Sequence, residues 1–152
     1  ALMQDAGFVV LRRSQFETLD QAVQLWSTSG PNTLLLGDSL GELGAYAALA
    51  RATMMGGSFE PLGGQNLIEP LAYGCPVVVG PHTFNFEQAT QEALHAKVAM
   101  RVQNWAEAIP AALTWAQRPV PGDGVSPQCR EFVQRHAGAV QRSVERLSAW
   151  LT

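Results

Sequence analysis

Short apolar runs alternate along this chain with longer stretches in which apolar residues recur every three or four positions. The short runs span four or five residues and predict strands at 8–11, 33–36, 52–55, 76–79 and 98–102. The longer stretches predict helices at 16–27, 43–51, 67–73, 85–95 and 105–117, and a last, C-terminal helix over 128–151. Strands and helices therefore alternate along almost the whole sequence.

This order predicts an α/β fold with a Rossmann-like parallel sheet and helices on both faces. Strands made only of apolar residues are typical of parallel sheets that are covered on both sides. Right-handed crossovers then give a doubly wound layer, in which ligands bind beyond the carboxyl ends of the strands. Glycines follow three of the predicted strands, at Gly37, at Gly56 and Gly57, and at Gly80. We expect function to reside near these glycines.

Composition narrows the class of protein further. The 152 residues are the size of one ordinary domain, so we expect a single domain over 1–152. Hydrophobic residues make up 47% and charged residues 15%, a balance that excludes a disordered tail. The net charge of −3 gives no electrostatic case for binding nucleic acid. Cys75 and Cys129 lack the spacing of zinc ligands, and the apolar runs are too short to cross a bilayer.

The segment 37–42, Gly-Asp-Ser-Leu-Gly-Glu, lies between a predicted strand and a predicted helix. Its small residues would let the backbone approach a ligand, and the N–H groups of a helix N-terminus favour an anion. It matches neither GxGxxG nor the P-loop. A tight turn in which Asp38 or Ser39 caps the helix and Glu42 interacts with its dipole is the structural alternative.

The segment 56–70 holds four glycines within nine residues, at positions 56, 57, 63 and 64. Such a loop predicts a close approach of the backbone to a ligand, or positive φ at a residue such as Gly64. Asn66 is expected to be the N-cap of the next helix, with Glu69 three residues later as in a capping box. The two side chains could then serve only to cap the helix. Alternatively, the helix N-terminus could hold a phosphate while the carboxylate binds sugar hydroxyls.

Four segments, 37–42, 56–58, 63–70 and 80–86, together resemble the donor-binding half of a GT-B glycosyltransferase. More narrowly, they resemble the bacterial 3-deoxy-D-manno-octulosonic acid (Kdo) transferase family, in order and with compatible spacing over nearly the whole chain. The resemblance implies a single nucleotide-sugar-binding domain that is the C-terminal half of a GT-B fold, with the N-terminal acceptor domain absent from this chain. One departure is Gln65, where the family usually has His, so we assign position 65 no catalytic role.

The resemblance also implies which residues hold the CMP part of the donor. They come from two segments: Leu40, Gly41, Glu42, Asn66, Leu67, Ile68 and Glu69. Further candidates for contacts with donor or acceptor are Ser58, Gly64 and His82. A family contact from a Pro-Arg pair to the CMP phosphate lies upstream of the strand at 8–11, and no such pair stands at the start of this chain. The general base belongs to the N-terminal domain, so no catalytic residue is expected here.

By the same resemblance, the full-length protein transfers Kdo from CMP-Kdo to a lipid A precursor, with inversion, in lipopolysaccharide biosynthesis. Its expected partners are these two substrates, its own N-terminal domain and the inner-membrane surface, at whose cytoplasmic face it would act. Neither a metal nor a cofactor is expected, and the isolated chain is expected to be soluble and inactive. Two alternatives stay open: a GT-B domain that uses a UDP-sugar, and a nucleotide-binding module without catalysis.

Overall fold

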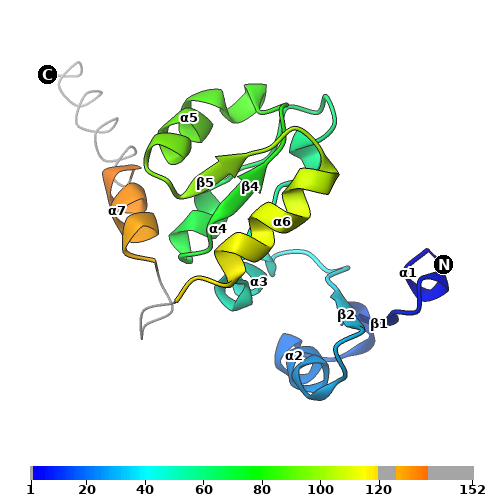
Figure 1. Cartoon of the computed structure of the whole chain (residues 1–152). Coiled ribbons are helices and arrows are strands. Elements are labelled where there is room, and N and C mark those ends of the chain that lie inside the picture. Colours follow the sequence, from blue (N-terminus) through cyan, green and yellow to red (C-terminus); the bar gives the residue numbers. More distant parts are fainter. Residues whose placement is uncertain (1, 120–125, 137–152) are drawn as a thin grey trace, which may run out of the picture. The chain divides into compact units, whose positions relative to one another are not determined.

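The structure is a computed structural model that describes residues 2–119 and 126–136 (Figure 1). It divides into two compact units, residues 1–43 and residues 44–152, each of which is described here by itself. The smaller unit contains α1 (Leu2–Asp5), β1 (Val9–Arg12), a 3-10 turn η1 (Arg13–Gln15), α2 (Leu19–Thr28) and β2 (Thr33–Leu36). Its two strands are parallel, with Val9 opposite Thr33. Thr18 caps α2 by accepting a hydrogen bond from the Gln21 amide.

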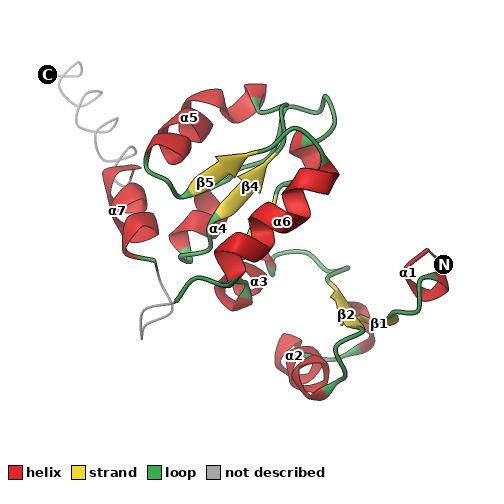
Figure 2. Cartoon of the chain, viewed as in Figure 1, coloured by secondary structure: helices red, strands yellow, loops and turns green. Residues whose placement is uncertain are grey.

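The larger unit is a three-stranded parallel sheet with helices around it (Figure 2). The helix α3 (Leu43–Leu49) begins at the boundary between the units. The remaining elements are β3 (Thr53–Met54), η2 (Gly56–Ser58), α4 (Ile68–Ala72), β4 (Val77–Val79), η3 (Phe84–Phe86), α5 (Glu87–His95), β5 (Ala99–Arg101), α6 (Trp105–Ala116) and α7 (Pro127–His136). Strand β4 is central, with β3 on one side and β5 on the other. All three strands run in the same direction, so their carboxyl ends meet at one edge.

The side chains of β4 enter two separate hydrophobic clusters. Val78 packs with residues of α6, among them Ala108, Ala111 and Trp115. Val77 and Val79 point to the opposite face, because successive side chains alternate across a strand. The sheet therefore has helices on both faces, as the sequence predicts, and the α/β fold class is confirmed.

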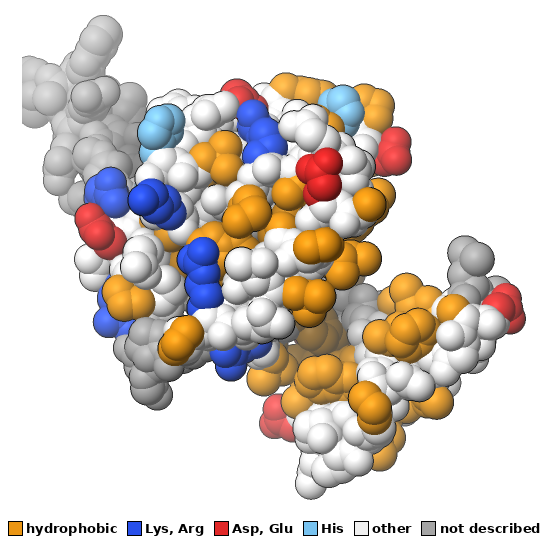
Figure 3. Space-filling model, viewed as in Figure 1, with side chains coloured by type: hydrophobic (Ala, Val, Ile, Leu, Met, Phe, Trp, Pro, Cys, Tyr) orange, Lys and Arg blue, Asp and Glu red, His pale blue; other side chains and the backbone are white. Residues whose placement is uncertain are grey.

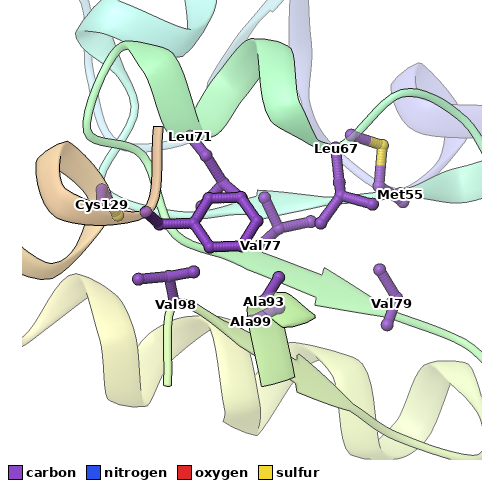
Figure 4. Close-up of a cluster of buried hydrophobic side chains, with 10 residues drawn as sticks. Met55, Leu67, Leu71, Val77, Val79, Ala93, Val98, Ala99 and Cys129 are labelled. Carbon is purple, nitrogen blue, oxygen red and sulfur yellow. The ribbon is translucent and has the colours of Figure 1, made fainter. Parts of the chain in front are cut away.

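The larger cluster joins five elements from distant parts of the sequence, α4, β4, α5, β5 and α7. It combines residues of the sheet with Leu71 of α4, Ala93 of α5 and Phe132 of α7 (Figure 4). Phe132 is 1% exposed, and a bond between His136 and Glu92 also links α7 to α5. The helix α7 is therefore part of the packed unit.

The described elements correct the sequence prediction in two respects, the lengths of the strands and the number of sheets. All five strands are present but most are shorter, since β3 has two residues and β4 three. The last helix is described over Pro127–His136, and the rest of the prediction over 128–151 lies outside the described residues. The expected single sheet is two sheets among the described strands, because local apolar patterns do not determine which strands pair. The single domain over 1–152 stays a prediction.

The helix α6 is apolar on two sides. Ala108, Ala111 and Trp115 are buried against the sheet, whereas Trp105, Ile109 and Leu113 follow one another every four residues on the outer side and are exposed. Hydrophobic side chains are accordingly seen over this unit in the space-filling view (Figure 3). In spite of this hydrophobicity, no described helix combines the length and the apolar character needed to cross a membrane.

Candidate functional site

Two loops lie at the carboxyl edge of the three-stranded sheet. The glycine loop (residues 56–66) follows β3, and the β4–α5 loop (residues 80–86) follows β4. Because parallel strands end at the same edge, these loops come together although more than a dozen residues separate them. In open α/β sheets this edge is where ligands bind.

Ser58 fastens the start of the glycine loop to the β4–α5 loop. Its hydroxyl donates to the Met55 carbonyl at 2.5 Å and accepts from the Gly80 amide at 2.7 Å. Its carbonyl accepts from the His82 amide at 2.9 Å. The residue is 0% exposed, so a direct contact from this side chain to a donor, for which it was a candidate, is incompatible with its burial. Ser58 instead holds the two loops together.

Gly63 and Gly64 have left-handed backbone conformations, with φ of +87° and +80°. Residues with a side chain rarely adopt such angles, so the alternative of positive φ at Gly64 is confirmed. The Gly64 amide also donates to the Gly57 carbonyl at 3.2 Å and is not free for a phosphate. Gly63 and Gly64 are thus required by the conformation of the chain itself.

The segment Asn66–Glu69 does not form the predicted capping box. The N-cap of α4 is Leu67, one residue later than predicted, and the Asn66 side chain accepts from the Ile68 amide at 3.1 Å. Leu67 is 1% exposed, so only its backbone groups could bind a ligand, whereas the half-buried Ile68 packs part of its side chain against the core. Asn66 itself is exposed.

Glu69 is the most informative of the predicted site residues. Its side chain is half-buried, yet its carboxylate has no hydrogen-bond or ion-pair partner in the part of the chain that the structure describes. A half-buried carboxylate without a partner loses hydration and gains nothing in return. In the first turn of α4 the Ile68 amide is bonded to Asn66 and Pro70 has no N–H, so the amide left without an acceptor is that of Glu69 itself. The carboxylate and this amide together can bind hydroxyl groups and an anionic oxygen.

The far end of the β4–α5 loop is anchored by charged groups that the sequence did not indicate. Thr83 donates to Glu87 at 2.5 Å, and Arg101, at the end of β5, donates to the Thr83 hydroxyl at 2.5 Å and to Glu87 at 3.1 Å. The hydrogen bond from Thr83 first, then the one from Gln91 and the Arg101 charge, lower the pKa of Glu87 from 4.5 to about 2. An ionised Glu87 therefore holds this loop on the sheet.

Acid should weaken this anchor. Because the pKa of Glu87 is lower in the folded chain, its contribution to the free energy of unfolding is complete above about pH 4.5 and is lost as the pH falls toward 2. We expect Glu87→Gln to lose less stability than the wild type between pH 6 and pH 3, measured by chemical denaturation at each pH. Glu17→Gln is the control, since no described group bonds that exposed carboxylate. Equal losses in wild type and Glu87→Gln would contradict this anchor.

The other predicted segment, residues 37–42, is described within the smaller unit. Asp38 accepts hydrogen bonds from the amide and the hydroxyl of Ser14, both at 2.8 Å, and these bonds lower its pKa. Glu42 accepts from Arg13, with Nη2 at 2.8 Å, and from Ser39 at 2.5 Å. Asp38 therefore joins the ends of β1 and β2, a structural role different from the predicted helix cap.

The remaining candidates have no partner that assigns them a role. Leu40 is 100% exposed, and Gly41, with φ of +82°, has no neighbouring group where a Cβ would lie. His82 is half-buried, and its only described hydrogen bond is made by its backbone amide to Ser58.

Both cysteines are buried, as expected for Cys75, and burial raises their pKa. Within residues 2–119 and 126–136, no three His, Cys, Asp or Glu side chains lie close enough together to hold a metal ion.

The chain is similar to proteins of known activity. It is 41% identical over 152 residues to a 3-deoxy-D-manno-octulosonic acid transferase from Bordetella pertussis, and 28% identical over 151 residues to one from Haemophilus influenzae. Each match covers 99% of this chain and 33% of the relative, so the chain spans about a third of the length of these curated relatives. No protein-family model matches the chain.

A solved structure matches as well. It is the crystal structure of the C-terminal CMP-Kdo binding domain of WaaA from Acinetobacter baumannii, with a TM-score of 0.71 at 27% identity. The match covers 88% of this chain and 65% of that chain. Parallel strands covered by helices, with loops gathered at their carboxyl edge, are thus the architecture of the C-terminal half of a GT-B fold. Within that class, the chain is similar to 3-deoxy-D-manno-octulosonic acid transferases, and over 88% of its length it matches the C-terminal domain of one of them.

Proposed function

We propose that this chain binds CMP-Kdo and is the donor-binding part of a Kdo transferase. The observation that carries the proposal is the half-buried carboxylate of Glu69, which has no partner among the described residues and lies in the first turn of α4. In a donor complex this carboxylate would accept hydrogen bonds from ribose hydroxyls. Amides near the start of α4 would face the phosphate. The similarity to Kdo transferases and to the CMP-Kdo binding domain of the matched structure supports CMP as the nucleotide.

Leu40, Gly41 and Glu42 complete the proposed CMP-binding set, together with Asn66, Leu67 and Ile68. Leu67 is buried in the core and can offer only backbone groups to the donor, whereas Ile68 is half-buried. Asn66 keeps an exposed side chain. His82 stays a candidate for contact with donor or acceptor.

The proposed reaction is an inverting displacement at the anomeric carbon of Kdo. A hydroxyl group of the lipid A precursor attacks this carbon after a general base has accepted its proton, and the bond to the CMP phosphate breaks. Negative charge grows on the departing phosphate, and donors aimed at this charge lower the barrier. The general base is proposed to lie in the N-terminal domain, so these 152 residues alone would bind nucleotide without transferring Kdo. The whole protein would act at the cytoplasmic face of the inner membrane.

A calorimetric comparison of CMP, UMP and UDP tests the proposal. We expect CMP to bind with a dissociation constant nearer millimolar than micromolar, which corresponds to a binding free energy of roughly 4–6 kcal/mol. CMP should bind more tightly than UMP or UDP. Tighter binding of UDP would favour the UDP-sugar transferase instead. Release of CMP from CMP-Kdo by the full-length protein only when a lipid A precursor is present would exclude the non-catalytic module. Acceptor-dependent turnover by the 152 residues would place the base within them.

Glu69→Gln should weaken CMP binding without weakening the fold. The substitution removes charge-assisted hydrogen bonds to the ribose, which corresponds to a loss of about 1–2 kcal/mol. No capping bond is lost, because the described carboxylate makes none. CMP titration and thermal denaturation of the same samples measure the two effects separately. Glu60→Gln is the matched control, since Glu60 is an exposed carboxylate of the same glycine loop.

The result that would contradict a binding role for Glu69 is an unchanged CMP affinity in Glu69→Gln. A fall in melting temperature by several degrees would show instead that the carboxylate serves the fold. An equal loss of affinity in Glu60→Gln would indicate a general effect of negative charge on the loop.

A further inference from the structure

The tip of the glycine loop is held by one side chain of the β4–α5 loop. The Asn85 amide nitrogen of the backbone donates to the Gly63 carbonyl at 3.1 Å, and its side-chain Nδ2 donates to the Leu62 carbonyl at 3.2 Å. A Cβ placed on Gly63 would lie only 2.6 Å from Asn85 Cγ and from Phe84 Cε2. The loop tip and Asn85 therefore fit against each other without space for a further atom.

Apart from Phe84, which lies against Gly63, few described side chains restrict this tip. The Leu62 side chain is 67% exposed and contributes little packing. Gly63 and Gly64 have no side chains and can adopt many backbone conformations when they are not held. Beyond Leu62 and Gly63, the next hydrogen bond on the way to α4 is the one from the Gly64 amide to Gly57. Three positions after Gly63 the chain reaches Asn66, where the proposed donor-binding segment begins.

We infer that Asn85 is a positioning residue of the proposed donor site. It holds the carbonyls of Leu62 and Gly63, and through them it orients the segment Asn66–Glu69 for the nucleotide. This inference rests on the proposed function, because the segment that Asn85 orients is the one proposed to bind CMP. Asn85 itself does not contact the donor. Because its own hydrogen bonds are exposed, it should contribute more to CMP binding than to the stability of the fold.

The residues on either side of Asn85 in the same loop explain why it can act as a fixed support. Thr83 is 3% exposed and is bonded to Arg101 and Glu87. The Phe86 amide donates to the Thr83 carbonyl at 2.8 Å, which closes the 3-10 turn that contains Asn85. The position of Asn85 is thus set by the end of β5 and the start of α5. Asn85 in turn fixes the tip of the glycine loop through its bonds to Leu62 and Gly63.

Two substitutions test the inference. Asn85→Asp keeps the shape but places a carboxylate oxygen against the Leu62 carbonyl, and Asn85→Ala removes the bond. We expect the dissociation constant for CMP to rise about fivefold to tenfold in Asn85→Asp and about threefold in Asn85→Ala. Hydrogen exchange of the amides of residues 60–66 should become faster in both variants without ligand. Gln88→Ala is the matched control, because Gln88 makes a comparable exposed side-chain bond, to Glu92, away from the glycine loop.

A double-mutant cycle with Glu69→Gln separates positioning from a general structural role. If Asn85 acts by orienting Glu69, Asn85→Asp should weaken CMP binding less in the Glu69→Gln background than in the wild type. If the two substitutions lower the CMP affinity independently, so that the double variant shows the product of the two single losses, the inference is overturned. Wild-type CMP affinity and wild-type exchange in the Asn85 variants would overturn it as well, and so would loss of the circular dichroism spectrum in both of them. If the wild type binds no CMP, the proposed function fails and this inference with it.

Discussion

Replacing Gly80 by alanine is expected to lower the free energy of unfolding by about 3 kcal/mol. Gly80 follows β4 directly and lies against the backbone of the turn after β3. A Cβ at this position would overlap the Ser58 carbonyl oxygen and lie 2.8 Å from the carbonyl carbon and 3.0 Å from Phe59 Cα. These are backbone atoms, which cannot turn aside as the end of a flexible side chain can. The two loops would have to separate, and the buried hydrogen bond between the Gly80 amide and the Ser58 hydroxyl would lengthen.

Chemical denaturation of Gly80→Ala measures this loss. Gly56→Ala is the matched control, because Gly56 belongs to the same pair of loops but has no atom within 4 Å of a Cβ. The control should change the free energy of unfolding by no more than about 0.5 kcal/mol. If both variants lose the same amount, the contact with Ser58 is not the cause of the loss.

Phe132→Ala should destabilise the protein by about 3–5 kcal/mol. Phe132 is 1% exposed and brings α7 into the hydrophobic cluster with Leu71, Val77 and Val98. Its removal leaves a cavity that the sheet cannot fill without moving. Because α7 packs mainly on α4, the helix that contains Glu69, the same variant should also reduce CMP binding at temperatures near its midpoint.

Phe84→Ala provides the comparison for this prediction. It makes the same chemical change at a residue that is 63% exposed, so it should cost less than about 1 kcal/mol. Thermal denaturation of both variants by circular dichroism is sufficient to compare them. A loss in Phe132→Ala as small as that in Phe84→Ala would mean that α7 does not stabilise the unit.

The elements of the larger unit could be predicted from the sequence because its strands lie in mostly apolar runs. Val77–Val79 and the region of Ala99 are buried on both faces, and such strands leave no polar alternation to confuse the prediction. The glycine loop was also predictable, since clustered glycines exclude a regular element. What these glycines contact was not predictable, because Gly63 and Gly80 lie against residues more than 20 positions away.

The details of the site depended on contacts that sequence spacing does not contain. Asn66 and Glu69 have the spacing of a capping box, yet the helix starts one residue later, and the buried Leu67 is its N-cap. Ser58 was a ligand candidate by its position after two glycines, and its burial is a consequence of tertiary packing. Asn85 belongs to a segment of the recognised resemblance, but nothing in the sequence pairs it with Leu62 and Gly63.

The three valines of β4 have a consequence for how the sheet finds its alignment. A shift of β4 by one residue would still bury valine on both faces, so the strand itself does not distinguish the observed pairing of Val77 with Thr53 and Ala99 from its neighbours. The residue after the strand does. In one direction Val79 would take the place of Gly80 and collide with Ser58; in the other, Pro81 would take it and would have no N–H to donate to the Ser58 hydroxyl. A single glycine outside the strand therefore disfavours misaligned pairings of β4. The three valines of β4 do not distinguish one alignment from another.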